Sequence, residues 1–191
     1  SIGIFNAEKL GIALAQDNDK MVKIICQDLI DTDMANGKTE EEAKDALESD
    51  VRRELKQRYL EGDLNRNLTV RQLARHGGMT QEEASAKVEG WDWFKANPDS
   101  DATEADVAGY LKMLPDLGRS MKDYGLSMDT YRKEKKAIGA FEADKDEKGE
   151  SIPYSKINKA FPYIHDLPLS AEQKTALAVA CGWSLKTVEK N

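Results

Sequence analysis

Residues 39–62 read TEEEAKDALESDVRRELKQRYLEG. The apolar side chains in this stretch recur at every fourth position, and the positions between them are mostly charged: Ala43, Leu47, Val51, Leu55 and Tyr59. Residues spaced in this way share one face of an α-helix. Thr39 followed by Glu42 is typical of a capped helix start, and Gly62 is typical of a helix end. The stretch therefore predicts a long amphipathic helix over residues 40–61.

Similar start and stop signals recur along the rest of the chain. Thr69 with Gln72, Thr80 with Glu83 and Ser170 with Gln173 repeat the capping pattern. We expect further helices over residues 7–16, 19–35, 70–75, 81–96, 104–114, 127–141, 155–164, 171–181 and 185–190. Runs in which Val, Ile and Thr alternate with polar residues do not occur in the sequence, which argues against a sheet. The predicted fold is all-α, an irregular, orthogonal bundle of about nine to ten helices.

The stretch ANPDSDATEAD, residues 96–106, is the best candidate for an internal boundary, because it places proline, serine and three aspartates between two apolar patterns. We therefore expect two loosely divided halves, residues 1–98 and residues 99–191, the second ending in an αα-corner. The chain begins SIGIFNAEKL, without an initiator methionine and within a helical pattern. This start is typical of a piece of a longer protein.

Charge and composition exclude several classes of protein. Of 191 residues, 40% are hydrophobic and 33% are charged, and the formal net charge is −7. This balance argues against a nucleic-acid partner, because nucleic-acid-binding domains usually carry a basic surface. The one dense basic run, RKEKK over residues 132–136, is predicted to be a solvated helix face. No apolar run is long enough to cross a membrane, so we expect no membrane segment.

Motifs for catalysis or metal binding are missing from the sequence. His76 lies where a helix is expected to end and is predicted to cap it. His165 is followed by Asp166, but no nucleophile motif accompanies the pair. Cys26 and Cys181 are expected to be buried free thiols. We therefore predict a protein that is not an enzyme, with no catalytic residue, no cofactor and no metal site.

Residues 144–155 resemble half of an EF-hand loop. Asp144, Asp146 and Gly149 fit its first, third and sixth positions, but the fifth is Lys148 and the twelfth is Ser155. A calcium loop needs oxygen ligands at both of those positions. A polar interhelix loop without useful calcium affinity is the prediction.

Aromatic residues gather in EGWDWF, residues 89–94. Such a group can stack on bases or sugars. Aromatic residues near the end of an amphipathic helix more often fill a core, so we predict that Trp91, Trp93 and Phe94 form one structural plug.

The C-terminal stretch KTALAVACGWSLKTVEKN, residues 174–191, has the spacing of a helix-turn-helix. Two interpretations remain open. In the first, Gly182 and Trp183 form a structural corner between two helices. In the second, the corner binds DNA through the side chains that its second helix presents: Lys186, Thr187 and Lys190. That helix has no arginine, and residues 170–191 carry a net charge of only +1, so the structural interpretation is favoured.

Three longer segments resemble a known group of proteins. They are GKTEEEAKDALESDVRRELKQRYLEGDL (37–64), HGGMTQEEASAKVEGWDWF (76–94) and DKDEKGESIPYSKINKAFPYIHDLPLSAEQKTALAVACGWSLKTVEKN (144–191). Together they are similar to helical modules of the large polyvalent and virion-associated proteins of phages and prophages of Firmicutes. The resemblance implies a structural or interaction module in the virion or the host bacterial cytoplasm. Its implied partners are other segments of a larger phage protein or of the virion.

Overall fold

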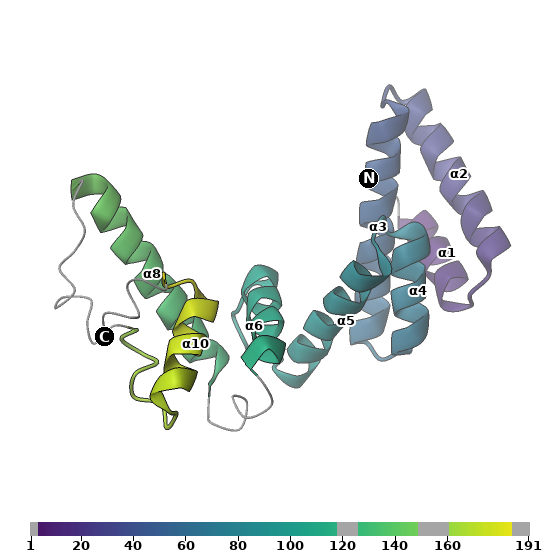
Figure 1. The fold of residues 1–191 in the computed structure, drawn as a ribbon. Coiled ribbons are helices and arrows are strands. Elements are labelled where there is room, and N and C mark those ends of the chain that lie inside the picture. The colour runs from purple at the N-terminus through teal and green to yellow at the C-terminus, as the bar shows by residue number, and fades with distance from the viewer. Residues whose placement is uncertain (1–3, 118–125, 149–160, 185–191) are drawn as a thin grey trace. The chain divides into compact units, whose positions relative to one another are not determined.

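The structure is a computed structural model of the chain, and it describes residues 4–117, 126–148 and 161–184. Those residues form helices, turns and loops, with no strand among them, which confirms the all-α prediction. Eight helices lie within the described ranges (Figure 1): α1 (Ile4–Ala15), α2 (Asp19–Ala35), α3 (Glu40–Leu60), α4 (Arg66–His76), α5 (Gln81–Ala96), α6 (Glu104–Leu117), α8 (Met128–Lys148) and α10 (Ala171–Cys181).

The chain separates into two compact units, Ser1–Ser100 and Asp101–Asn191, called unit 1 and unit 2 below. This division falls two residues after the boundary expected at residue 98. The helix expected over residues 185–190 lies outside the described residues, as does most of the one expected over 155–164. Residues 161–167 form turns and bends.

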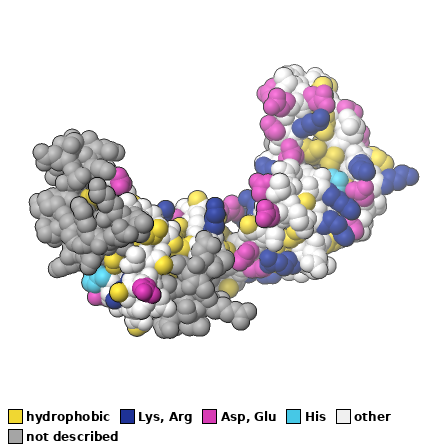
Figure 2. All heavy atoms as spheres, viewed as in Figure 1, with side chains coloured by type: hydrophobic (Ala, Val, Ile, Leu, Met, Phe, Trp, Pro, Cys, Tyr) yellow, Lys and Arg dark blue, Asp and Glu magenta, His cyan; other side chains and the backbone are white. Residues whose placement is uncertain are grey.

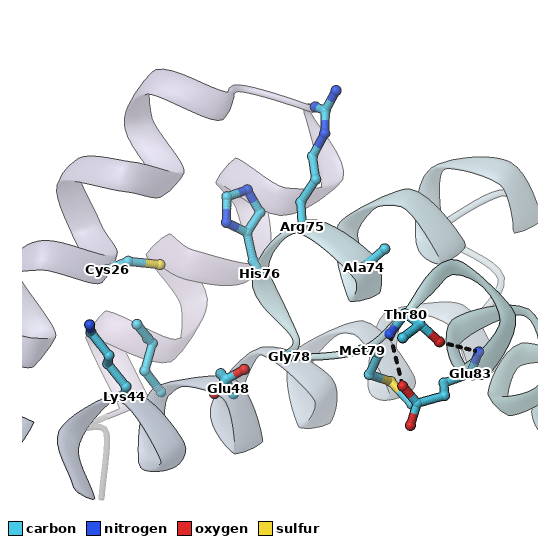
Figure 3. A pocket seen from close by; sticks show the side chains of 11 residues that line it. Cys26, Lys44, Glu48, Ala74, Arg75, His76, Gly78, Met79, Thr80 and Glu83 are labelled. Atoms are coloured by element: carbon cyan, nitrogen blue, oxygen red, sulfur yellow. Dashed lines mark hydrogen bonds between the residues drawn. The ribbon is translucent and has the colours of Figure 1, made fainter. Parts of the chain in front are cut away.

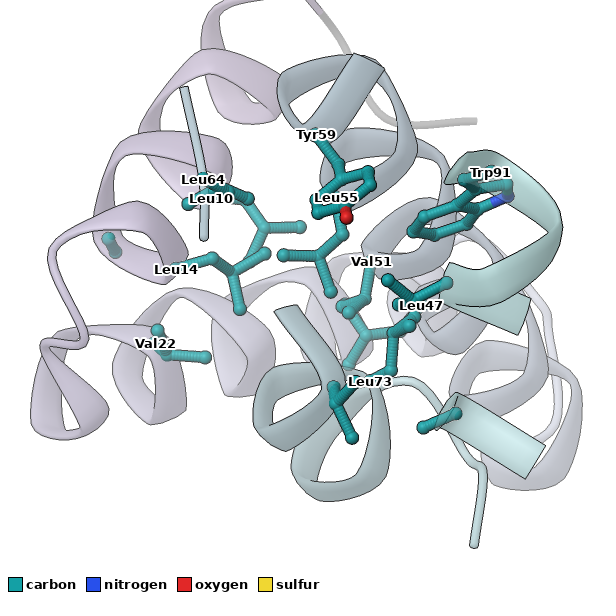
Figure 4. Packing of buried hydrophobic residues seen from close by; sticks show 14 residues of the cluster. Leu10, Leu14, Val22, Leu47, Val51, Leu55, Tyr59, Leu64, Leu73 and Trp91 are labelled. Carbon is teal, nitrogen blue, oxygen red and sulfur yellow. The ribbon is translucent and has the colours of Figure 1, made fainter. Parts of the chain in front are cut away.

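Helix α3 is the central element of unit 1. Its start is held by a complete capping box, in which the Thr39 side chain accepts from the Glu42 backbone and Glu42 accepts from Thr39 in return. The predicted stripe is buried along its whole length: Ala43, Leu47, Val51, Leu55 and Tyr59. Helices α1, α2, α4 and α5 all contact α3. Figure 4 shows the aliphatic side chains of α1 meeting those of α3, with Trp91 of α5 beside them.

Helix α4 begins earlier than the sequence pattern predicts. Its cap is Asn65, whose Oδ1 accepts from the backbone N–H of Leu68 at 2.8 Å. Thr69, the predicted cap, lies inside the helix, where its hydroxyl donates to the Asn65 carbonyl at 2.7 Å. The capping interpretation of Thr69 with Gln72 was therefore wrong. Gln72 is instead fully buried, and its Nε2 donates to the Leu14 carbonyl of α1 at 3.0 Å.

Unit 2 has a core rich in aromatic side chains, drawn from α6, α8, α10 and the turns before α10. Tyr110 of α6 and Tyr131 of α8 pack edge to face with ring centroids 5.7 Å apart. The Tyr110 hydroxyl also donates to the Leu126 carbonyl at 2.8 Å. Helix α8 runs on to Lys148, so the first residues of the predicted polar loop over 144–155 are helical, and the rest of that loop lies outside the described residues.

A buried carboxylate lies within the unit 2 core. Glu134 of α8 is 0% exposed, although the run RKEKK that contains it was predicted to be a solvated face. Its Oε1 accepts from Trp183 Nε1 at 2.7 Å, and its Oε2 accepts from the backbone N–H of Tyr163 at 2.9 Å. The interpretation of the run was wrong at this one position, because the donors that satisfy Glu134 come from distant parts of the chain.

Candidate binding groove

The structure separates the three aromatic residues that were predicted to form one plug. Trp91 is buried in the unit 1 core and packs against Tyr59, with ring centroids 6.0 Å apart. Trp93 and Phe94 are only half-buried and pack edge to face on each other, with centroids 5.4 Å apart. Neither belongs to the buried cluster that contains Trp91. Because adjacent positions on a helix point in different directions, α5 directs only Trp91 of these three aromatic residues into the core.

Gly182 and Trp183 have the structural positions expected of a helix end. Gly182 caps α10 with a φ of +118°, a left-handed conformation that favours glycine. Trp183 is buried and packs against Phe141, with ring centroids 5.5 Å apart. The proposed DNA-binding positions, Lys186, Thr187 and Lys190, lie outside the described residues. The DNA-binding alternative therefore stays a prediction.

Each of the two thiols has a raised pKa, and each of the two histidines lies beside a carboxylate. Burial raises the pKa of Cys26 to about 11 and that of Cys181 to about 12. Both thiols are therefore poor nucleophiles near neutral pH, because the thiolate is the reactive form. His76 Nε2 lies 3.2 Å from Asp19 Oδ1 of α2, so it joins two helices besides standing at the end of α4. His165 Nδ1 lies 2.9 Å from the adjacent Asp166 Oδ1.

A groove of about 570 Å³ opens on the surface of unit 1, between α2, α3 and the turn that joins α4 to α5. It is referred to below as the groove. Figure 3 shows its walls, with Cys26 on one side and the α4–α5 turn on the other. Its lining combines apolar and charged side chains: Cys26, Lys44, Leu47, Glu48, Ala74, Arg75, His76, Gly78, Met79, Thr80 and Glu83.

The α4–α5 turn that forms one wall is fixed by local sequence. Gly78 has a φ of +72°, which a glycine adopts without strain. A Cβ at this position would collide with the Glu48 carboxylate, so the missing side chain is what allows Glu48 to lie against the turn. Arg52 Nη1 of α3 donates to the Gly77 carbonyl at 2.7 Å. The Thr80 and Glu83 capping box then starts α5.

Most of the charged groups around the groove already have partners, and Glu48 is an exception. Lys44 Nζ lies 3.0 Å from Glu40 Oε1, and Glu83 accepts from the Thr80 backbone at 3.0 Å. Glu48 is half-buried, and no hydrogen bond or ion pair joins it to another side chain in the described part of unit 1. A half-buried carboxylate without a partner retains part of its cost of desolvation. A bound cation would offset that cost.

The surface around the groove is mixed in character. Figure 2 shows hydrophobic side chains over α2 and α3 on this face, with acidic and basic side chains close by. The groove could not be predicted from the sequence, because its residues come from three segments far apart in the chain. The HGG sequence at residues 76–78 was the one local signal, since paired glycines after a helix mark a tight turn.

Comparison with known proteins identifies no relative of the chain. No protein-family model matches the chain, and no curated protein or solved structure matches it significantly. In the described ranges, no group of three or more His, Cys, Asp and Glu side chains is placed to hold a metal ion. Among the helices of those ranges, none is both long and apolar enough to span a bilayer.

Proposed function

We propose that the chain is a non-enzymatic helical module that binds another protein segment in the groove of unit 1. The observation that carries this proposal is the groove itself, an open concave surface on a well-packed helical scaffold, with apolar residues among the charged ones of its lining. Its partly exposed apolar residues are Cys26, Ala74 and Met79. Covering apolar surface of this kind is the main favourable term in protein association.

The chemistry of the groove favours binding over catalysis. Its one thiol, Cys26, has a pKa raised to about 11 by burial, and its one imidazole, His76, is held by Asp19. A nucleophilic cysteine needs the opposite shift, toward a lower pKa, and a base within reach. A protein segment that packs against the apolar residues of the groove needs neither of these features.

The resemblance of three sequence segments to phage modules suggests which kind of protein supplies the bound segment. We infer that the bound segment belongs to the same large phage or prophage protein, or to another component of the virion. The genes that adjoin the coding sequence test this inference. Portal, capsid and tail genes are the expected neighbours, and a neighbourhood of metabolic genes alone would contradict it.

Binding in the groove is tested by selecting binders from a random library of displayed 16-residue peptides against the whole chain. The selected peptides are then synthesised and titrated by fluorescence polarisation. The side chain of Ala74→Trp would occupy the groove and should weaken their binding by at least about tenfold, since the peptides could no longer contact the apolar lining. Ala86→Trp on the exposed face of α5 makes the same change away from the groove and is the matched control.

Far-ultraviolet circular dichroism and thermal unfolding establish that both variants are folded. If Ala74→Trp fails to fold, it is replaced in the experiment by Met79→Glu, which places a charge among the same apolar residues. Peptides that bind the wild type and the groove variants equally would overturn the proposal, and so would a selection that yields no saturable binder.

A further inference from the structure

We propose that the groove receives a lysine or arginine side chain of the bound segment, with Glu48 as the partner of its positive charge. This inference rests on the proposed function and names the chemistry of the partner. Figure 3 shows Glu48 beside Gly78 in the middle of the groove, between the α3 wall and the α4–α5 turn.

The shape of the groove suits a long side chain with a charged end. Leu47, Ala74 and Met79 supply apolar contacts along the lining, and Cys26 adds a protonated thiol. Lysine and arginine bury their methylene stems against apolar surface while the charged group reaches a polar site. A short acidic side chain would leave most of this apolar surface uncovered.

Glu48 is the group best placed to receive the charged end. Its carboxylate is half-buried against Gly78 and has no ion-pair partner among the residues that the structure describes. The cations four positions away on the same helix have other partners: Lys44 lies 3.0 Å from Glu40, and Arg52 donates to the Gly77 carbonyl at 2.7 Å. An incoming ammonium or guanidinium would therefore form a charge-assisted hydrogen bond with an acceptor that nothing else satisfies.

The surrounding charge favours the same kind of partner. Residues 28–42, which include the end of α2 and the start of α3, carry six acidic side chains and one basic one. Such a surface raises the local concentration of a basic segment and speeds its association. Arg75 is the opposing feature, because it is exposed and also lines the groove. An acidic probe therefore belongs in the test.

The experiment uses three small probes of similar length: Nα-acetyl-lysine N-methylamide, the neutral norleucine analogue and the acidic glutamate analogue. Each is titrated into the ¹⁵N-labelled whole chain, and the backbone amide shifts of Leu47, Glu48, Gly78 and Met79 are followed. We expect saturable shifts with the lysine probe and binding at least about fivefold weaker with the other two. Glu48→Gln should weaken the lysine probe by about fivefold to tenfold, as for a partly buried ion pair.

Glu89→Gln is the matched control, because it removes the same charge from an exposed position on α5 that does not line the groove. It should leave the titration with the lysine probe unchanged. Equal binding of the lysine and norleucine probes would overturn the inference. Tighter binding of the glutamate probe would overturn it in favour of an acidic partner. Equal effects of the two Gln variants would also overturn it, because the lysine probe would then respond to the net charge of the chain and not to Glu48.

The proposed function and this inference can fail separately. If the peptides bind Ala74→Trp more weakly but bind Glu48→Gln as they bind the wild type, the groove is a binding site without a preference for a basic side chain. Peptides that are insensitive to both changes would reject both proposals.

Discussion

The two units each bury one tryptophan, and they treat its indole N–H in opposite ways. Trp91 of unit 1 is 2% exposed, and its Nε1 has no hydrogen-bond partner among the described residues. Trp183 of unit 2 is 5% exposed, and its Nε1 donates to Glu134 at 2.7 Å. Unit 1 uses its tryptophan as an apolar filler beside an aliphatic core. Unit 2 uses its tryptophan both as a filler and as a donor to a buried carboxylate.

This difference follows from how each unit closes its core. In unit 1, the stripe on α3 provides one continuous apolar face that four other helices cover. In unit 2, the turns before α10 and the residue after Gly182 must be fixed against α8, and Glu134 fixes both through directional hydrogen bonds. A core that lacks one dominant helix can therefore obtain its order from a polar centre, at the cost of desolvating that centre.

The largest expected effect is the loss of either tryptophan. Trp91→Ala and Trp183→Ala should each lower the free energy of unfolding of their own unit by about 3–5 kcal/mol, because each leaves a large cavity in a packed core. Urea titration followed by far-ultraviolet circular dichroism measures the change. A loss below about 1 kcal/mol for Trp183→Ala would mean that the corner after α10 is not a packed structural element.

Replacement by phenylalanine sharpens the comparison, because it keeps most of the ring and removes only the indole N–H together with some volume. Trp183→Phe leaves Oε1 of Glu134 without its donor, whereas Trp91→Phe removes an N–H that had no partner. Trp183→Phe should therefore cost more than Trp91→Phe by about 1–3 kcal/mol, the usual cost of an unsatisfied buried group. Equal losses in the same urea titrations would argue against a structural role for the hydrogen bond to Glu134.

The smallest effect is a dependence of unit 2 stability on pH. Burial raises the pKa of Glu134 above its ordinary value of 4.5, although hydrogen bonds from Trp183 and from the Tyr163 backbone act in the opposite direction. The Glu134 carboxyl therefore keeps its proton to a higher pH in the native state than in the unfolded chain. This contribution to stability is full below the unfolded pKa and is lost as the pH rises through the folded pKa.

Unfolding of the wild type and of Glu134→Gln between pH 4 and pH 7 measures this contribution, since the variant cannot titrate at that position. We expect the wild type to lose stability relative to the variant as the pH rises, by at most about 1.4 kcal/mol per pH unit for one proton. Curves that stay parallel would show that Glu134 titrates alike in both states. Unit 1 buries the neutral Gln72 instead, so the substitution Glu134→Gln should leave the pH profile of unit 1 unchanged.

The sequence predicted those parts of the fold that depend on local interactions. The helix over residues 40–60 was found from its four-residue stripe, and α2, α5 and α10 have the predicted bounds. The capping boxes at Thr39, Thr80 and Ser170 are all present. Such signals are readable because both partners of each cap lie within four residues of each other. The early start of α4 was missed because Asn65 is not followed by a Glu or Gln three positions later.

Features that depend on distant partners were not predictable from one sequence. Glu134 lies between Lys133 and Lys135, and a charged run of this kind is usually exposed. Its donors, Tyr163 and Trp183, are 29 and 49 residues away. The groove has the same property, since Cys26 and Met79 line one groove only when α2 and the α4–α5 turn pack around α3.

The condition of the two cysteines has a practical consequence for chemical labelling. Cys181 is fully buried beside Met113, with 3.7 Å between the sulfur atoms, and Cys26 has a pKa raised to about 11. A cysteine introduced at the surface has a pKa of about 8.5, so near neutral pH its thiolate fraction exceeds that of Cys26 by about 300-fold. Maleimide dyes or spin labels should therefore react with the introduced cysteine, and the two native cysteines need not be replaced. The unmodified chain can thus serve as the background for distance measurements between its two units.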